Sequence, residues 1–172
     1  MKNVLPSGAD PGTSLSAAVM PLCPSAPPGA ADATLFGVVT GPVGYRRMRY
    51  LTKLQPVTSE TLALAGPVRL GQVFRVAATC AGRQCTHFDG TNCRLAQRIV
   101  EFLPPVIDGI PPCRIRPTCR WWRQEGKAAC QRCPEVTTEI ANPTELQRRV
   151  ASTGSTPGYK PPTSRSNVSG GG

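Results

Sequence analysis

The sequence predicts a small, irregular α+β domain stabilised by metal, with a short N-terminal sheet, a cysteine-rich and partly helical second half, and disordered tails. Seven of the eight cysteines and the only histidine fall between Cys80 and Cys133. Short β-branched and aromatic runs precede this stretch, and both ends are rich in Pro, Gly and Ser. With 19 prolines and 5% aromatic residues the core must be thin, so a bound metal would contribute directly to folding.

Composition divides the 172 residues into four regions. Residues 1–33 and 150–172 cannot bury enough apolar surface to offset the entropy of ordering them, so we expect both to be disordered. Residues 34–79 are expected to form a small β-rich support. Residues 80–149 are expected to form the metal-binding region.

Three strands and one short helix are predicted in the support region. Residues 34–40 form a β-branched and aromatic run that ends at a Gly-Pro pair, and residues 45–54 alternate large apolar with basic side chains. Residues 61–65 are a short helical candidate that ends at a second Gly-Pro pair. Residues 72–78 form the third predicted strand, which leads the chain to Cys80.

The best-defined helix is predicted just after His87. Thr91 or Asn92 is a suitable N-cap, Cys93 would lie at the start of the helix, and apolar residues recur at helical spacing as far as about Leu103. Because the positive end of a helix dipole favours an anion, we expect the Cys93 thiolate to form more easily than that of a free cysteine.

The clustered cysteines and histidine form a metal-binding pattern, because thiolates and imidazole are the ligands of zinc and of iron–sulfur clusters. The eight candidate ligands suffice for two four-ligand sites, and they are Cys80, Cys85, His87, Cys93, Cys113, Cys119, Cys130 and Cys133. The first four fall within 14 residues and make a set of three cysteines and one histidine. Cys23 lies far upstream in a Pro/Ala/Gly-rich stretch, so we expect it to belong to neither site.

The last four cysteines form the second candidate set. Cys130 and Cys133 make a C-x2-C pair followed by Pro134, an ending typical of bacterial ferredoxin motifs. If one unbroken helix followed Cys119, it would separate Cys119 from Cys130 by about 16 Å. Either Gly126 breaks that helix and folds Cys130 back, or the two cysteines serve different sites.

Iron–sulfur clusters, of the [4Fe–4S] type, are the first interpretation of these ligands, and zinc is the alternative. Structural zinc sites usually use two short C-x2-C pairs, and this chain has one. Disulfides or free thiols, and a single site with the other cysteines merely buried, are further alternatives. Since no N-terminal apolar run could serve as a signal peptide and no stretch is long enough for a membrane span, we expect a cytoplasmic protein whose thiols stay reduced.

A formal charge of +10 raises the question of nucleic-acid binding. Between Cys80 and Cys133, nine basic and four acidic residues give a balance of +5, and two metallated sites with seven thiolates would lower this balance to +2. Over half of the local charge could therefore neutralise the sites. Trp121 and Trp122, which arginines flank, would shield a metal from water or, alternatively, stack on bases.

The chain carries none of the usual catalytic motifs, and its one histidine is a candidate ligand, so we find no catalytic residues. The sequence predicts an iron–sulfur protein with one or two clusters that transfers electrons, senses redox state or assists a larger enzyme. Its partner would then be a redox protein or an enzyme, and not a membrane. The alternative is a zinc-stabilised module that binds nucleic acid or an acidic protein.

Overall fold

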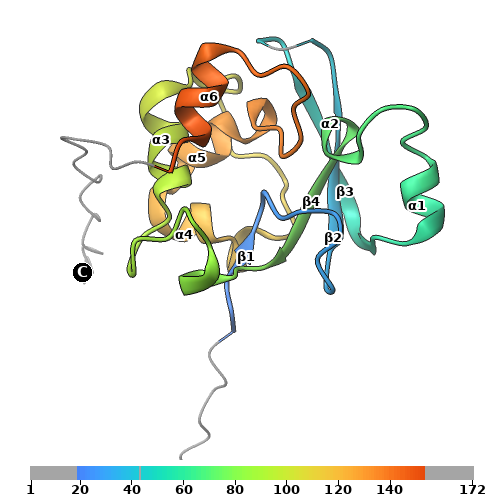
Figure 1. Cartoon of the computed structure of the whole chain (residues 1–172), viewed down its shortest axis with the longest axis horizontal. Coiled ribbons are helices and arrows are strands. Elements are labelled where there is room, and N and C mark those ends of the chain that lie inside the picture. Colours follow the sequence, from blue (N-terminus) through green and yellow to red (C-terminus); the bar gives the residue numbers. More distant parts are fainter. Residues whose placement is uncertain (1–18, 43, 154–172) are drawn as a thin grey trace, which may run out of the picture.

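The computed structural model of the protein describes residues 19–42 and 44–153. Four strands form one antiparallel sheet in the order β1-β4-β2-β3. They are β1 (Leu22–Cys23), β2 (Thr34–Thr40), β3 (Arg47–Pro56) and β4 (Phe74–Thr79). Helices cover both faces of this sheet (Figure 1), which confirms the α+β class.

The predicted support region agrees closely with the structure. Strand β2 has the predicted bounds, and β3 lies two residues further along than predicted at both ends. Helix α1 (Ser59–Ala63) begins at a capping box in which Thr58 and Thr61 satisfy each other's backbone N–H groups. The third predicted strand begins instead as a turn of helix, α2 (Leu70–Val73), before β4.

The N-terminal segment differs from the prediction of disorder over residues 1–33. Strand β1 pairs with the edge of β4, and Ala26 and Ala33 are buried. Strand pairing satisfies the backbone of this Pro-rich segment, a contribution that composition does not reveal. At the other end, α6 (Glu145–Ala151) extends two residues into the predicted C-terminal tail, and the remainder of both predicted tails falls outside the described residues.

The cysteine-rich half consists of short helices joined by turns. They are η1 (Gly82–Gln84), α3 (Arg94–Phe102), η2 (Arg116–Thr118), α4 (Arg120–Glu125), α5 (Lys127–Arg132) and η3 (Cys133–Glu135). Helices α3 to α6 gather on one side of the sheet, whereas α1 and α2 lie on the other (Figure 1). Within the described residues, no helix is both long and apolar enough to cross a membrane.

Neighbouring residues of the sheet contribute to two different hydrophobic clusters. Leu35 and Val76 pack with Leu70 in the smaller cluster, while Phe36 and Ala77 pack in the larger one against the helical half, as the alternation of side chains along a strand requires. The larger cluster also contains three of the cysteines, Cys93, Cys119 and Cys133. The candidate ligands are therefore part of the core that joins the sheet to the helices.

Candidate metal centre

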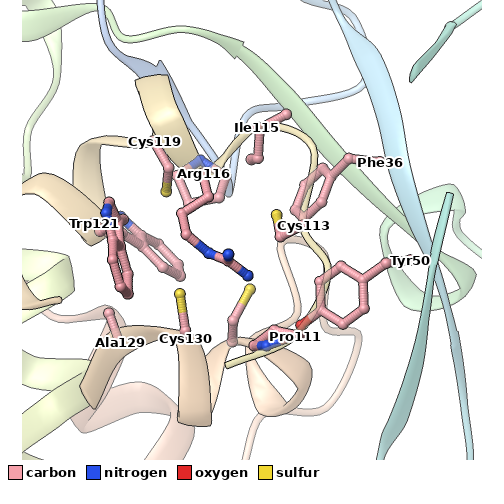
Figure 2. Close-up of a pocket in the computed structure, with 13 residues that line it drawn as sticks. Phe36, Tyr50, Pro111, Cys113, Ile115, Arg116, Cys119, Trp121, Ala129 and Cys130 are labelled. Atoms are coloured by element: carbon pink, nitrogen blue, oxygen red, sulfur yellow. The ribbon is translucent and has the colours of Figure 1, made fainter. Parts of the chain in front are cut away.

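Four cysteines from separate elements line one pocket between the sheet and the helices (Figure 2). Cys113 precedes η2, Cys119 lies between η2 and α4, Cys130 is in α5, and Cys133 begins η3. The structure thus brings together the whole second set of predicted ligands.

Gly126 is the residue that allows this arrangement. It has φ +59° and ψ −139°, ends α4 and begins α5. Because a residue with a Cβ rarely adopts this conformation, glycine is needed at the break. Of the two arrangements left open by the sequence, the structure has the broken helix, with Cys119 and Cys130 lining the same pocket.

The remaining walls of the pocket are largely apolar. Phe36 and Tyr50 approach from the sheet, and Trp121 and Trp122 approach from α4. Trp121 is only 2% exposed, so its ring packs in the core and is not available to stack on bases. A lining of this kind excludes water and lowers the local dielectric constant around whatever occupies the pocket.

Burial raises the pKa of all four thiols, to about 12 for Cys119 and Cys133. The charges of the other three thiols raise the pKa of Cys133 further, because like charges at short range disfavour ionisation. The backbone N–H groups of Trp121 and Trp122 act in the opposite direction and lower the pKa of the Cys119 thiol. The metal-free thiols are therefore protonated at neutral pH, and a metal would displace those protons.

Two arginines extend toward these cysteines. Arg75, only 1% exposed, donates a hydrogen bond to the backbone carbonyl of Cys133, and its charge lowers the pKa of that thiol. Arg116 extends among the sulfurs of Cys113 and Cys130 in Figure 2, and its charge lowers the pKa of both thiols. Arg75 lies in an apolar strand, so sequence patterning gave no reason to place it at a site.

Several buried polar atoms around the pocket have no hydrogen-bond partner within the described residues. They include Nε of Arg75, Nε and Nη2 of Arg116, and the hydroxyl of Tyr50. Unpartnered buried donors are rare in folded proteins and each calls for an explanation. The sulfurs of an iron–sulfur cluster accept hydrogen bonds, so donors and thiols together fit such a group.

The remaining four cysteines are the second group, and they include Cys23, which the sequence excluded and which strand pairing places beside Cys80. The charges of Cys80, Cys85 and Cys93 each raise the pKa of Cys23, as expected for thiols that lie near one another. Burial has the larger effect and brings the pKa of Cys23 to about 12. The sequence contained one signal that Cys23 belongs with the other cysteines: the chain has eight cysteines, which is enough for two sets of four.

His87 occupies a different environment from these cysteines. It lines a separate cavity with Leu95, Val136 and Val150, which no cysteine lines. Its Nδ1 lies 3.0 Å from Nη2 of Arg98, and burial together with the charge of Arg98 lowers its pKa. The structure therefore does not bring His87 together with Cys80, Cys85 and Cys93 in one cavity.

Cys93 lies at the start of α3, as predicted, but as its N-cap. The backbone N–H groups of Leu95 and Ala96 lower the pKa of its thiol. Burial has the larger effect, so the pKa of Cys93 is raised overall. The expectation of an easily formed thiolate is wrong for the metal-free protein, because the sequence did not reveal how deeply this residue is buried.

All eight cysteines are free thiols in the structure. No group of three or more Cys, His, Asp or Glu side chains in residues 19–42 and 44–153 is arranged to hold a metal ion, so metal binding and its contribution to stability stay predictions. Comparison of the chain with protein-family models, with curated proteins and with solved structures finds no match.

Proposed function

We propose that the protein binds a [4Fe–4S] cluster through Cys113, Cys119, Cys130 and Cys133 and uses it to transfer single electrons. The observation that carries this proposal is the pocket itself: four thiols share it with buried donors that have no other partner in the described residues. Thiolates would bind the iron atoms, and the free N–H and O–H groups would bond to sulfur.

The spacing of the thiols favours a cluster over a zinc ion. Structural zinc sites usually use two short C-x2-C pairs, and this set has one, Cys130 and Cys133, which Pro134 follows as in bacterial ferredoxin motifs. All four cysteines line the same pocket, so a single cluster could use all of them.

Charge compensation also supports a cluster in this pocket. Four thiolates and a dipositive core carry a net charge of −2, which two nearby cations would balance. Arg75 and Arg116 supply two positive charges beside Cys113, Cys130 and Cys133. A buried guanidinium is costly to desolvate unless a negative group lies nearby, and thiolates of a bound cluster would supply such groups to Arg75 and Arg116.

Electron transfer is the reaction that these surroundings fit best. Held by Cys113, Cys119, Cys130 and Cys133, such a cluster would supply one-electron chemistry in this pocket, with the electron coming from a reduced protein partner and passing to an oxidised one. No protons or groups are transferred, which agrees with a lining that, among the described residues, contains no carboxylate or imidazole. The buried Trp121 ring limits the access of water and of oxidants to the cluster.

Purification without oxygen tests the proposal. We expect a brown protein with a broad absorbance near 400 nm and at least about four irons and four sulfides per chain. Cys119→Ala and Cys133→Ala should each lose about four irons, because each removes a buried ligand. Thr118→Ala is the matched control, since the Thr118 hydroxyl donates to the carbonyl of Ile115 and its loss should leave the iron content unchanged.

A colourless protein with stoichiometric zinc would contradict the cluster and favour the zinc alternative. A protein with iron but without acid-labile sulfide would also contradict it. The nucleic-acid interpretation predicts binding that weakens steeply as salt is added. Of the two tryptophans that could stack on bases, Trp121 is buried and is not available to do so.

A further inference from the structure

We propose that Cys23, Cys80, Cys85 and Cys93 form a second four-thiolate site, in which Cys23 supplies the ligand that the spacing in the sequence assigns to His87. The identity of the bound group, a second iron–sulfur cluster, rests on the function proposed above. The ligand set does not, because it follows from how the N-terminal strand and the loop after β4 are placed.

Strand pairing brings Cys23 and Cys80 together. Cys23 is opposite Ala78 in the β1–β4 ladder, and the N–H of Cys80 donates to the carbonyl of Pro21 at 2.8 Å, which continues the pairing by one residue. In an antiparallel ladder, Cys80 is therefore the diagonal neighbour of Cys23 on the same face, where side chains are close enough to interact.

Hydrogen bonds fold the loop from Cys80 to Cys93 into a compact coil. The N–H of Cys85 donates to the carbonyl of Gly82, and that of Phe88 donates to the carbonyl of Cys85. Phe88 then pairs with Cys93 in an isolated bridge. Backbone contacts therefore hold Cys85 and Cys93 near each other, at the end of the loop that Cys80 begins beside Cys23.

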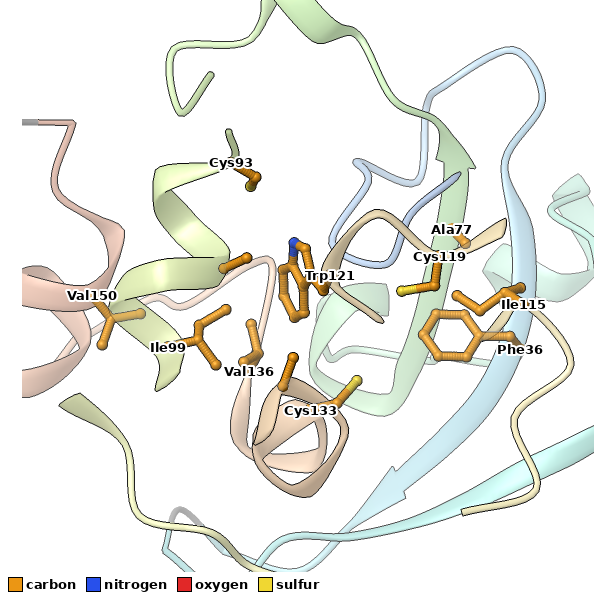
Figure 3. Packing of buried hydrophobic residues seen from close by; sticks show 12 residues of the cluster. Phe36, Ala77, Cys93, Ile99, Ile115, Cys119, Trp121, Cys133, Val136 and Val150 are labelled. Atoms are coloured by element: carbon orange, nitrogen blue, oxygen red, sulfur yellow. The ribbon is translucent and has the colours of Figure 1, made fainter. Parts of the chain in front are cut away.

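Helix α4 fixes the backbone of Cys93 from the other side. The side chain of Gln124 accepts a hydrogen bond from the N–H of Cys93 at 2.7 Å and donates one to its carbonyl at 3.0 Å. The Trp121 ring lies between Cys93 and Cys119, with its indole nitrogen turned toward the Cys93 side (Figure 3). That nitrogen is buried and has no partner among the described residues, so it could donate to a sulfur of the second site.

The hydrogen bond between His87 and Arg98 argues against His87 as the fourth ligand. Arginine has donors and no acceptor, so Nδ1 of His87 must accept from Arg98. In the neutral imidazole the proton is then on Nε2, which leaves no free nitrogen lone pair for a metal. His87 therefore keeps a structural role, and Arg98 connects it to the carbonyl of Val150 in α6.

Reconstitution with ferrous iron and sulfide, followed by iron analysis, tests the ligand set. We expect about eight irons in the unmodified protein and about four in Cys23→Ala. Cys80→Ala should also hold about four irons, and so should the double variant Cys23→Ala/Cys80→Ala. Each of these changes removes a ligand of the same site. His87→Gln, which removes the imidazole and keeps a polar side chain, should hold about eight.

The second site would be overturned if Cys23→Ala held as many irons as the unmodified protein, whether that number is about eight or about four. Loss of about four irons in His87→Gln would overturn the choice of Cys23. If the unmodified protein takes up no iron, the proposed function fails, and the same variants loaded with zinc still test the ligands: about two zinc ions are then expected, and about one in Cys23→Ala.

Alkylation of the unmodified protein gives a measurement that does not depend on how well a variant folds. Cys23 should resist iodoacetamide when the protein is loaded and react after the metal is removed, as followed by mass spectrometry of its peptide. Alkylation of Cys80, followed in its own peptide, should change in the same way. Equal labelling of Cys23 with and without metal would contradict its role as a ligand.

Discussion

Arg116 places a positive charge inside a pocket whose other walls are apolar side chains and thiols. Its guanidinium carbon lies 5.4 Å from the centre of the Trp122 ring, a cation–π contact that orients the side chain. Its Nε and Nη2 atoms are buried without partners in the described part of the chain. An electron added to a bound cluster would increase the negative charge beside this cation, so Arg116 should stabilise the reduced state.

Arg116→Gln is therefore expected to make the reduction potential of the cluster more negative. A unit charge about 6 Å away, at an effective dielectric constant of about 20, is worth about 2.8 kcal/mol, or roughly 120 mV for one electron. Redox titration followed by electron paramagnetic resonance of the reduced cluster would measure this shift.

Arg114→Gln is the matched control for Arg116→Gln. It removes the same charge from an exposed side chain that bonds to the carbonyl of Thr52, where solvent screens it. Equal shifts in the two variants would show that the potential responds only to overall charge and not to the Arg116 guanidinium in the pocket.

At the scale of the element, the sharp turn between α4 and α5 determines the form of the first site. Two helices of six residues each carry Trp121 and Cys130 to the same pocket. Neither helix is long enough to be stable alone, so both depend on packing against the core and on the conformation of Gly126. The turn therefore couples the geometry of the cysteines to the stability of the helical half.

Gly126→Ala should destabilise the protein by about 1–3 kcal/mol, because a Cβ would force a strained backbone at φ +59°. No atom lies within 4 Å of the added Cβ, so the cost would come from the backbone alone. Gly109→Ala, which also meets open space but has no positive φ, should leave stability unchanged or raise it slightly. Urea unfolding curves of both variants, measured by circular dichroism, provide the comparison.

At the scale of the whole molecule, one core serves both the fold and the candidate sites. The larger hydrophobic cluster includes Phe36 and Ala77 from the sheet, Ile99 from α3, and buried cysteines from both groups. Strand β1 lies beside both groups, since it carries Cys23 and its Leu22 forms a bridge with Cys119. Occupation of the sites should therefore stabilise the entire described domain.

Removal of the bound metal, by oxidation in the presence of a chelator, should lower the free energy of unfolding of the whole domain by several kcal/mol. Urea titrations followed by tryptophan fluorescence and by far-UV circular dichroism should both shift to lower urea. A variant without Cys23 and Cys133, treated in the same way, should change little because it has no complete site to lose. Identical unfolding curves before and after removal would contradict a structural role for the metal.

Local signals in the sequence predicted local structure well. The bounds of β2 follow from a β-branched run that ends at Gly41-Pro42, and the break at Gly126 is one of the two arrangements that the cysteine spacing allows. The sequence failed where the cause lies far away along the chain. The partner of β1 is β4, more than 50 residues downstream, so composition alone left Cys23 in a disordered tail.

The candidate ligands show the same contrast between what local sequence indicates and what distant contacts decide. The four cysteines of the second set were grouped by their order in the sequence, and all four line one pocket. His87 was grouped by proximity with Cys85, whereas its side chain contacts Arg98 on α3. Hydrogen bonding decides which nitrogen of a histidine is available, and no spacing rule contains that information.

The pairing of β1 with β4 also bears on the order in which the protein could be assembled. Cys80, Cys85 and Cys93 are close in the chain, but Cys23 is 57 residues before Cys80, and closing a loop of that length costs about 3.6 kcal/mol of entropy. A nascent second site would therefore gather three thiolates first and keep one coordination position open. We expect delivery of metal at that stage, with docking of the N-terminal strand as the step that seals the site.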